Sequence, residues 1–184
     1  MDGRPLPALA LLATVAAGCA AKLPPGHWDA SARRVCAGHV CYVVGTLDAS
    51  WRMVHFESAA AGWFSDRAGA VIESNATCRD DAEAAPLPAL TRELLVGYTE
   101  RRILDEALVP LQRREALRTR LVAKLDGVPM ELEIYVLRRN GCVFDLSYAA
   151  PPDLFAVAAP DFARFVAGFA DARPDLAAVV HAGS

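Results

Sequence analysis

The side chains with the greatest capacity for chemistry in this sequence are five cysteines and four histidines. His27 lies in a proline-containing segment and His181 lies near the C-terminus, which leaves His39 and His55 inside the predicted domain. A serine or cysteine nucleophile needs an adjacent base, and neither internal histidine has a recognisable acidic partner nearby in the sequence. The chain also lacks a His-Glu-x-x-His helix, a Gly-x-Ser-x-Gly elbow and a phosphate-binding glycine loop. We therefore expect no catalytic residues and no cofactor.

A short segment, Cys36-Ala-Gly-His39-Val-Cys41, contains two thiols and an imidazole. These soft ligands suit copper or zinc, but a fourth ligand is not apparent in the sequence. The other interpretation is disulfide chemistry, because exported cysteines are usually oxidised. We favour the disulfide and expect no metal site.

The N-terminus contains an apolar run, Leu6 to Ala17, that ends in Ala16-Ala17-Gly18-Cys19. About a dozen residues suit the apolar part of a signal peptide, whereas a membrane-spanning helix needs roughly 20. The small residues fit a cleavage pocket, and the thiol of Cys19 can accept diacylglycerol. These residues resemble the bacterial lipobox, so we expect residues 1–18 to be a lipoprotein signal peptide and Cys19 to be lipidated. The alternatives are an ordinary signal cut near Gly18 and a buried helix of a cytosolic protein.

Lipidation of Cys19 leaves an even number of cysteines, which in an oxidising compartment suggests two disulfides with three possible connectivities: Cys36, Cys41, Cys78 and Cys142. Cys78 ends a strand-like run at Ala70–Thr77, and Cys142 directly follows a turn at Asn140-Gly141. Since both lie at strand ends, we predict a Cys78–Cys142 disulfide. Cys36 then pairs with Cys41.

The charge of the chain argues against a nucleic-acid partner. The formal net charge is −3 at pH 7. The nearest approach to a basic cluster is interrupted by Glu115 and consists of Arg113, Arg114, Arg118 and Arg120. Binding to nucleic acid requires clustered lysine and arginine. We expect no nucleic-acid binding.

Apolar spacing predicts an antiparallel sheet with two helices. Leucines at helical spacing predict a helix over Pro88–Thr99, and the stripe Phe162, Phe165, Val166 and Phe169 predicts a second helix with Pro160 in its first turn. The strand-like runs are Val40–Leu47, Trp51–Phe56, Ala70–Thr77, Arg101–Leu111 and Ala116–Asp126.

The clearest predicted element is a hairpin over Pro129–Tyr148. Its Asn140-Gly141 pair suits a two-residue type I′ turn, which would place Leu137 opposite Phe144 and Tyr135 opposite Leu146. A hairpin that is apolar on both faces indicates a sheet covered on both sides.

Asp145 lies in the middle of this apolar hairpin. A buried carboxylate is costly unless it is hydrogen-bonded or its pKa rises. One interpretation is a ligand contact. The interpretation that we favour is an acceptor for a helix N-terminus or a loop amide.

Three stretches carry a family resemblance: Leu125-Asp126-Gly127-Val128-Pro129, Asn140-Gly141-Cys142-Val143-Phe144-Asp145-Leu146 and Phe162-x-x-Phe165-Val166-x-x-Phe169. They look like small proteobacterial lipoproteins similar in plan to the Mog1/PsbP fold, and the likeness covers about Cys41 to Phe169. The resemblance implies an α+β domain, an α/β/α sandwich with helices on both faces of an antiparallel sheet. The family includes a photosystem accessory subunit and a small-GTPase binder, and it offers no active-site motif to carry over.

Together these features predict a signal at 1–18, a flexible tether at 19–34, and one Mog1/PsbP-like domain at 35–184 with a short C-terminal tail. We expect an outer-membrane lipoprotein that faces the periplasm, because the resemblance implies this sorting where Ala20 follows Cys19. Its expected partners are the lipid bilayer, through the Cys19 anchor, and a protein of the cell envelope.

The expected function is a non-catalytic binding or accessory module. The second hypothesis is a carrier of a small apolar or cell-wall-derived ligand in a pocket between sheet and helix, and the third is a hydrolase. A dry cavity beside Phe144 and Phe165 would favour the carrier, and a hydrogen bond from His55 to a serine or carboxylate in a cleft would favour the enzyme. A solid core with an exposed apolar patch would favour the binder.

Overall fold

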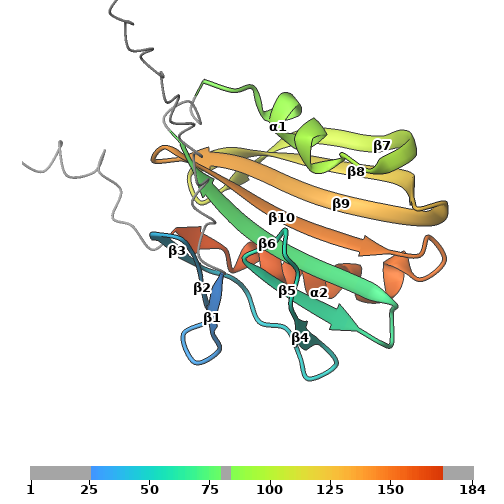
Figure 1. Ribbon diagram of the computed structural model, residues 1–184, viewed down its shortest axis with the longest axis horizontal. Helices are drawn as coiled ribbons and strands as arrows, with labels where there is room; N and C mark the ends of the chain where they lie inside the picture. Colours follow the sequence, from blue (N-terminus) through green and yellow to red (C-terminus); the bar gives the residue numbers. More distant parts are fainter. Residues whose placement is uncertain (1–25, 80–83, 172–184) are drawn as a thin grey trace, which may run out of the picture.

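Seven antiparallel strands form the main sheet, in the spatial order β4-β5-β6-β10-β9-β8-β7 (Figure 1). The computed structural model describes residues 26–79 and 84–171. The strands of this sheet are β4 (Arg52–Val54), β5 (Ala61–Ser65), β6 (Ala70–Cys78), β7 (Tyr98–Leu111), β8 (Arg114–Leu125), β9 (Val128–Arg139) and β10 (Cys142–Ala150).

A second, four-stranded sheet has the order β1-β2-β3-β11. Its strands are β1 (His27–Asp29), β2 (Arg34–Ala37), β3 (Val40–Val43) and β11 (Ala170–Asp171). The helices of the described residues are α1 (Leu87–Leu94) and α2 (Phe155–Ala167).

The β9–β10 hairpin confirms the register predicted from its turn. Asn140 and Gly141 have φ angles of 52° and 72°, the left-handed region that a type I′ turn requires. Leu137 lies opposite Phe144, and Tyr135 lies opposite Leu146. This hairpin forms the centre of the main sheet, because β6 pairs with the other edge of β10.

The larger of two apolar cores lies between the main sheet, α2 and the small sheet. Aromatic rings dominate it: Phe144 makes edge-to-face contacts with Tyr42 and Phe169, with ring centroids 5.4 Å apart in each pair. Phe144 and Phe165 are both fully buried. The smaller core lies on the opposite face, where Leu87 and Leu90 of α1 pack against apolar side chains of β8 and β9.

The predicted α/β/α sandwich is wrong. Most of the described chain is strand, and the small sheet shares one face of the main sheet with α2. The eight-residue α1 covers only part of the other face, against β8 and β9, so the helices form no layer on each side. The fold is a β-rich α+β fold. The reason is that β7, β8 and β9 are 12 to 14 residues long and take up much of the sequence that a helical layer would need.

The two predicted helices exist, but their ends differ from the prediction. The first helix ends at Leu94 rather than Thr99, and Gly97 with a φ of 93° turns the chain into β7 at Tyr98. The second helix begins at Phe155, so Pro160 lies inside it and not in its first turn. Proline removes a backbone donor at that point, which buried contacts of this helix must offset.

The small sheet begins within the segment predicted as a tether, since β1 and the first residue of β2 precede residue 35. Trp28 of β1 packs edge-to-face on Trp63 of β5, with ring centroids 5.1 Å apart. Residues 26–34 therefore contribute to the packed structure. No helix within the described ranges is long and apolar enough to cross a membrane.

Candidate functional site

The predicted lipidation residue, Cys19, lies outside the described residues. The other four cysteines form the two pairs that we expected, Cys36–Cys41 and Cys78–Cys142. In each pair the cysteines lie directly opposite each other on neighbouring antiparallel strands, with α-carbons 4.0 Å apart. Because the Cys36 and Cys41 sulfurs are bonded to each other, no thiolate remains there for a metal. No group of histidine, cysteine and acidic side chains within the described ranges has the arrangement of a metal site.

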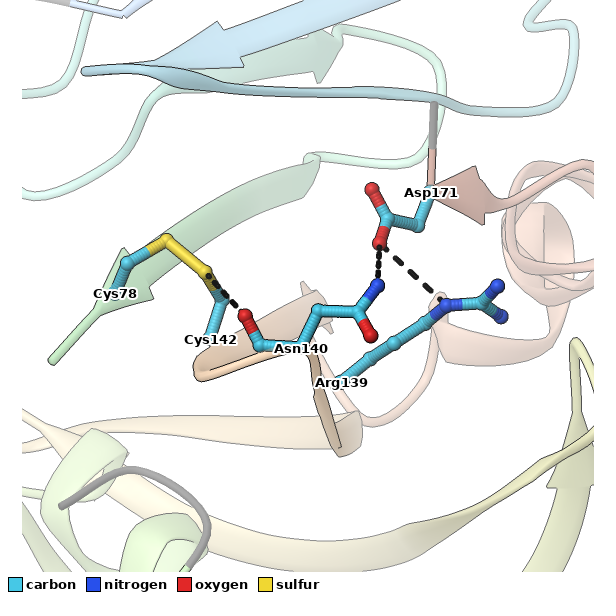
Figure 2. Close-up of a disulfide and its surroundings, with 5 residues drawn as sticks. All are labelled: Cys78, Arg139, Asn140, Cys142 and Asp171. Atoms are coloured by element: carbon cyan, nitrogen blue, oxygen red, sulfur yellow. Dashed lines mark hydrogen bonds and ion pairs between the residues drawn. A yellow bond between two sulfur atoms is a disulfide. The ribbon is translucent and has the colours of Figure 1, made fainter. Parts of the chain in front are cut away.

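The Cys78–Cys142 disulfide lies beside a polar cluster that joins the two sheets (Figure 2). The side-chain amide of Asn140 donates a hydrogen bond of 3.2 Å to the carboxylate of Asp171 in β11. Nε of Arg139 lies 3.5 Å from the same carboxylate, whose side chain is fully buried. The disulfide, the β9–β10 turn and the last strand of the small sheet are therefore held together at one end of the main sheet.

The two internal histidines line one cavity of about 520 Å³, which we call the histidine pocket. The β2–β3 turn, the segment before β5 and the end of β6 form its wall: Gly26, Ala37, Gly38, His39, His55, Phe56, Glu57, Ser58, Ala59, Ala60, Asn75, Ala76, Thr77 and Cys78. The sequence does not predict that His39 and His55 line the same pocket, because His39 lies in the β2–β3 turn and His55 in the loop after β4.

The histidine pocket does not show the hydrogen bond that would favour a hydrolase. Glu57 and Ser58 also line it, but neither His39 nor His55 makes a hydrogen bond or ion pair with any residue in the described ranges. A catalytic base needs a hydrogen-bonded nucleophile and a partner that orients it. The pocket brings suitable side chains together without that arrangement.

The core also lacks the feature that would favour a ligand carrier. Phe144 and Phe165 have no solvent-accessible surface. A water-sized cavity beside either ring would expose part of it. The space between sheet and α2 is therefore filled by side chains at these two positions.

Asp145 lies on the α1 side of the main sheet, opposite Asn75 of β6 and Val136 of β9. Burial raises its pKa to about 7, and the nearby Glu73 carboxylate adds to this shift. The favoured interpretation from sequence, an acceptor for a helix N-terminus or loop amide, is wrong, because Asp145 accepts no hydrogen bond from the described residues. Burial also raises the pKa of Glu73.

Replacing Asp145 with asparagine should stabilise the protein more at pH 8 than at pH 4. The carboxyl group binds its proton more tightly in the folded state than in the unfolded state, whose pKa is the ordinary 3.8. Stability is therefore lost as the pH rises from about 4 to about 7, and partial solvent access limits the loss to about 2 kcal/mol. Asparagine has no charge to bury. Thermal melts of both proteins at the two pH values measure the difference.

The matched control is Asp153→Asn, since Asp153 is exposed and makes no hydrogen bond or ion pair with the described residues. The melting temperature of this variant should differ from that of the wild type by the same small amount at both pH values. An equal effect of Asp145→Asn at pH 4 and pH 8 would contradict the raised pKa.

Six exposed large apolar side chains lie on the same side of the molecule as α1, spread along the sheet, and we call them the α1-side patch: Leu94, Val96, Ile103, Leu108, Leu125 and Val128. Directly opposed residues of antiparallel strands project from the same face. Ile103 lies opposite the buried Leu121, and Leu108 lies opposite the buried Leu117, both in the core under α1. Val128 lies opposite Leu125 on that face. Leu94 and Val96 belong to the end of α1 and the loop that follows.

The sequence alone does not indicate that the side chains of this patch are exposed. Its strand residues belong to runs that were correctly predicted as strands, but an apolar residue in such a run is ordinarily buried. The missing information was that β7 is the edge strand of the sheet and that α1 is too short to cover it.

No protein family matches the sequence, and no curated protein matches it. The structure is similar to the solution structure of the cyanobacterial PsbP protein of Synechocystis sp. PCC 6803, with a TM-score of 0.52 and 7% identity over 84% of this chain and 95% of that one. LpqN of Mycobacterium tuberculosis, which is involved in cell envelope biogenesis, gives a TM-score of 0.49 and 14% identity over 68% and 80% of the two chains. A Pseudomonas aeruginosa protein of unknown function gives a TM-score of 0.47 and 12% identity over 70% and 87%.

The similarity to PsbP confirms the PsbP-like fold that the sequence resemblance implied. At this level of identity it shows the fold alone.

Proposed function

We propose that the protein is a non-catalytic binding module of the bacterial cell envelope, anchored through Cys19, whose α1-side patch is covered by a partner protein. The observation that carries this proposal is the exposure of the patch itself: Val96 is 82% exposed, Leu108 58% and Val128 57%. Single exposed apolar residues are ordinary, whereas a group of six on one face is typical of an interaction site.

The partner proposed here is a different protein with an apolar surface, rather than a second copy adding to the edge of the sheet. Strand β7 has two irregularities in its pairing with β8, between Thr99 and Arg102 and between Ile103 and Asp105. Bulges and charged side chains protect an edge strand from pairing with another strand. The apolar side chains project from the face, so a partner would contact side chains and not the open backbone.

Two further observations support this proposal over its alternatives. The histidine pocket lacks a hydrogen-bonded catalytic pair among the described residues, which disfavours the hydrolase. The filled space around Phe144 and Phe165 disfavours the carrier.

The experiment places a photo-crosslinking amino acid at Ile103 or Leu108 of the full chain in its native bacterium. Irradiation should yield a discrete adduct of the protein with one other protein from both positions. The control position is Val157 of α2, which is 40% exposed on the other face and should yield none. Adducts are measured on immunoblots and identified by mass spectrometry.

Substitutions refine this test. Leu108→Asp should abolish the adduct formed from position 103, while Val157→Asp, His39→Ala and His55→Ala should leave it unchanged. Adducts from all three positions, none from any, or an adduct with the mass of two copies would contradict the proposed partner. In a strain that lacks the protein, the His39→Ala and His55→Ala variants should restore the wild-type phenotype. If either variant folds but fails to do so, the enzyme hypothesis would be restored.

Lipidation has its own test. Cys19→Ser should leave the precursor unprocessed, because the thiol that accepts diacylglycerol is gone. The wild-type protein should carry two or three acyl chains, enough for stable anchoring where one chain is only marginal. Intact-mass spectrometry of the membrane fraction measures both forms, and fractionation should place the wild type in the outer membrane. An unmodified mature N-terminus in the wild type would refute the anchor.

A further inference from the structure

A cleft of about 500 Å³ lies next to the β7–β8 turn, on the α1 side of the main sheet, and three arginines line it. Its wall consists of Leu87, Pro110, Arg113, Arg114, Glu115 and Arg138. Among the described residues, three cationic side chains and one anionic side chain give the wall a formal charge of +2. We call it the arginine cleft.

Two of these guanidinium groups are available for a ligand. Arg113 and Arg114 are exposed and make no hydrogen bond or ion pair with any described residue. Arg138 comes from a different strand and is oriented by a hydrogen bond of 2.9 Å from its Nη1 to the carbonyl oxygen of Ala85. Guanidinium groups bind phosphate oxygens with paired hydrogen bonds, so Arg113 and Arg114 suit a phosphate group, and Arg138 adds a further positive charge to the wall.

The backbone conformation of the β7–β8 turn indicates that Arg113 does more than connect the two strands. Gln112 and Arg113 form the two-residue loop between β7 and β8, with φ angles of 51° and 61°. Asparagine and glycine are the usual residues of such a turn, because other side chains strain the left-handed conformation. This chain uses them in its β9–β10 turn but has an arginine here.

The position of the cleft indicates where the phosphate comes from. Nη1 of Arg139 donates a hydrogen bond of 3.0 Å to the carbonyl oxygen of Gln112, so the β7–β8 turn lies beside the β9–β10 turn. Cys142 directly follows the β9–β10 turn, so the Cys78–Cys142 disulfide lies at this same end of the sheet. Gly26, the first described residue, lines the histidine pocket together with Cys78.

The chain between Cys19 and Gly26 is short. The seven residues 19–25 span at most about 25 Å when fully extended. The cleft lies three strands from β6, or about 15 Å along the sheet. A bilayer that holds the lipid chains of Cys19 is therefore within reach of the end of the sheet that carries the arginine cleft.

We propose that the arginine cleft binds the phosphate of an anionic phospholipid headgroup in the membrane that anchors the protein. This inference rests on the proposed anchor at Cys19 and adds to it an orientation: the β7–β8 turn faces the bilayer. No residue of the α1-side patch lines the cleft, so the seated headgroup would leave this patch, Ile103 and Leu108 included, free for the partner protein.

The test is vesicle flotation with the full chain carrying Cys19→Ser, which has no lipid of its own. Vesicles contain phosphatidylcholine alone or with phosphatidylglycerol, and neutral vesicles give the baseline for any binding by the N-terminal apolar segment. Each arginine near an anionic surface contributes about fivefold in binding, so we expect the anionic-to-neutral ratio to be at least about five. About 0.5 M NaCl should lower the ratio towards one.

Charge reversal identifies the residues. Arg113→Glu with Arg114→Glu should reduce the ratio to one, and the milder Arg113→Gln with Arg114→Gln should reduce it in part. Arg101→Glu with Arg102→Glu, which changes the net charge equally on the exposed part of β7, should leave it unchanged. A ratio that survives reversal of Arg113 and Arg114, or that falls equally in the control pair, would overturn the proposal. Circular dichroism melts establish that each variant is folded.

Two further experiments distinguish a phospholipid headgroup from the other ligands that the cleft could bind, a free anion or a protein. If anionic vesicles have no effect while inorganic phosphate raises the melting temperature of the wild type and not of the reversed pair, the cleft binds a free anion. If a photo-crosslinker at Gln112 in cells forms an adduct with a protein other than the partner captured from Ile103, the cleft binds a protein. Both results would overturn the headgroup. The Cys19→Ser variant used for flotation carries no lipid, so the flotation result does not depend on the proposed anchor. Lipidation of Cys19 is tested separately, by the intact mass of the native protein.

Discussion

Removing the Cys78–Cys142 disulfide should lower the free energy of unfolding by about 4 kcal/mol. The bond closes a loop with a sequence separation of 64 residues, and a cross-link of that length strongly restricts the unfolded chain. Since single domains have a total stability of about 5–15 kcal/mol, Cys78→Ala with Cys142→Ala should bring the protein close to unfolding. Urea unfolding followed by tryptophan fluorescence measures the change.

The Cys36–Cys41 disulfide is the internal control. It closes a loop with a separation of only five residues, and the same chain-entropy relation gives about 2 kcal/mol for its removal. Cys36→Ala with Cys41→Ala should therefore cost about half as much. An equal loss from both double variants would contradict the loop-length argument and point to local packing instead.

Replacing Asp161 with alanine should destabilise the protein by about 3 kcal/mol, because a buried donor would lose its acceptor. The indole Nε1 of Trp51 donates a hydrogen bond of 3.0 Å to this carboxylate. Arg67 lies 3.4 Å away, and Arg164 of the same helix also contacts it. Asp161 therefore connects α2 to the loop before β4 and to the turn after β5. Urea unfolding measures the loss.

Asparagine at the same position separates the two kinds of contact. Asp161→Asn retains an oxygen acceptor for Trp51 but loses the charge that attracts the two arginines. Since both arginine side chains are 53% exposed, their ion pairs contribute little, and this variant should lose only about 1 kcal/mol. A loss as large as that of Asp161→Ala would show that the ion pairs dominate and the indole hydrogen bond does not.

Local patterns in the sequence were sufficient to predict the central elements. Strand-like runs and the Asn140-Gly141 turn predicted β6, β8 and the β9–β10 hairpin to within about two residues at their ends. The Asn140-Gly141 turn predicted the register of that hairpin, because positive φ at both residues allows one tight turn and hence one pairing. Strand ends then predicted the cysteine pairs, since Cys142 and Cys78 lie opposite each other once β10 pairs with β6.

Elements whose stability comes from distant contacts were missed. Strand β5, Ala61–Ser65, resembles a loop in sequence, and a Cβ added at Gly62 would lie 2.4 Å from the ring of Phe56, which would have to move. Strand β1 is three residues long and carries Trp28, whose partner Trp63 lies 35 positions later in the chain. No local periodicity reports such a contact.

The candidate sites also depend partly on local sequence and partly on contacts between distant residues. The sequence alone determined which residues could do chemistry: the lipobox-like Cys19, the four paired cysteines, and the lack of a recognisable catalytic motif. Which side chains meet depends on the tertiary structure. It placed His39 and His55 in one pocket, brought Arg138 to Arg113 and Arg114, and left Ile103 and Leu108 exposed beside a short helix. The physical reason is that backbone preferences act over a few residues, whereas the order of strands in a sheet depends on burial summed over the whole chain.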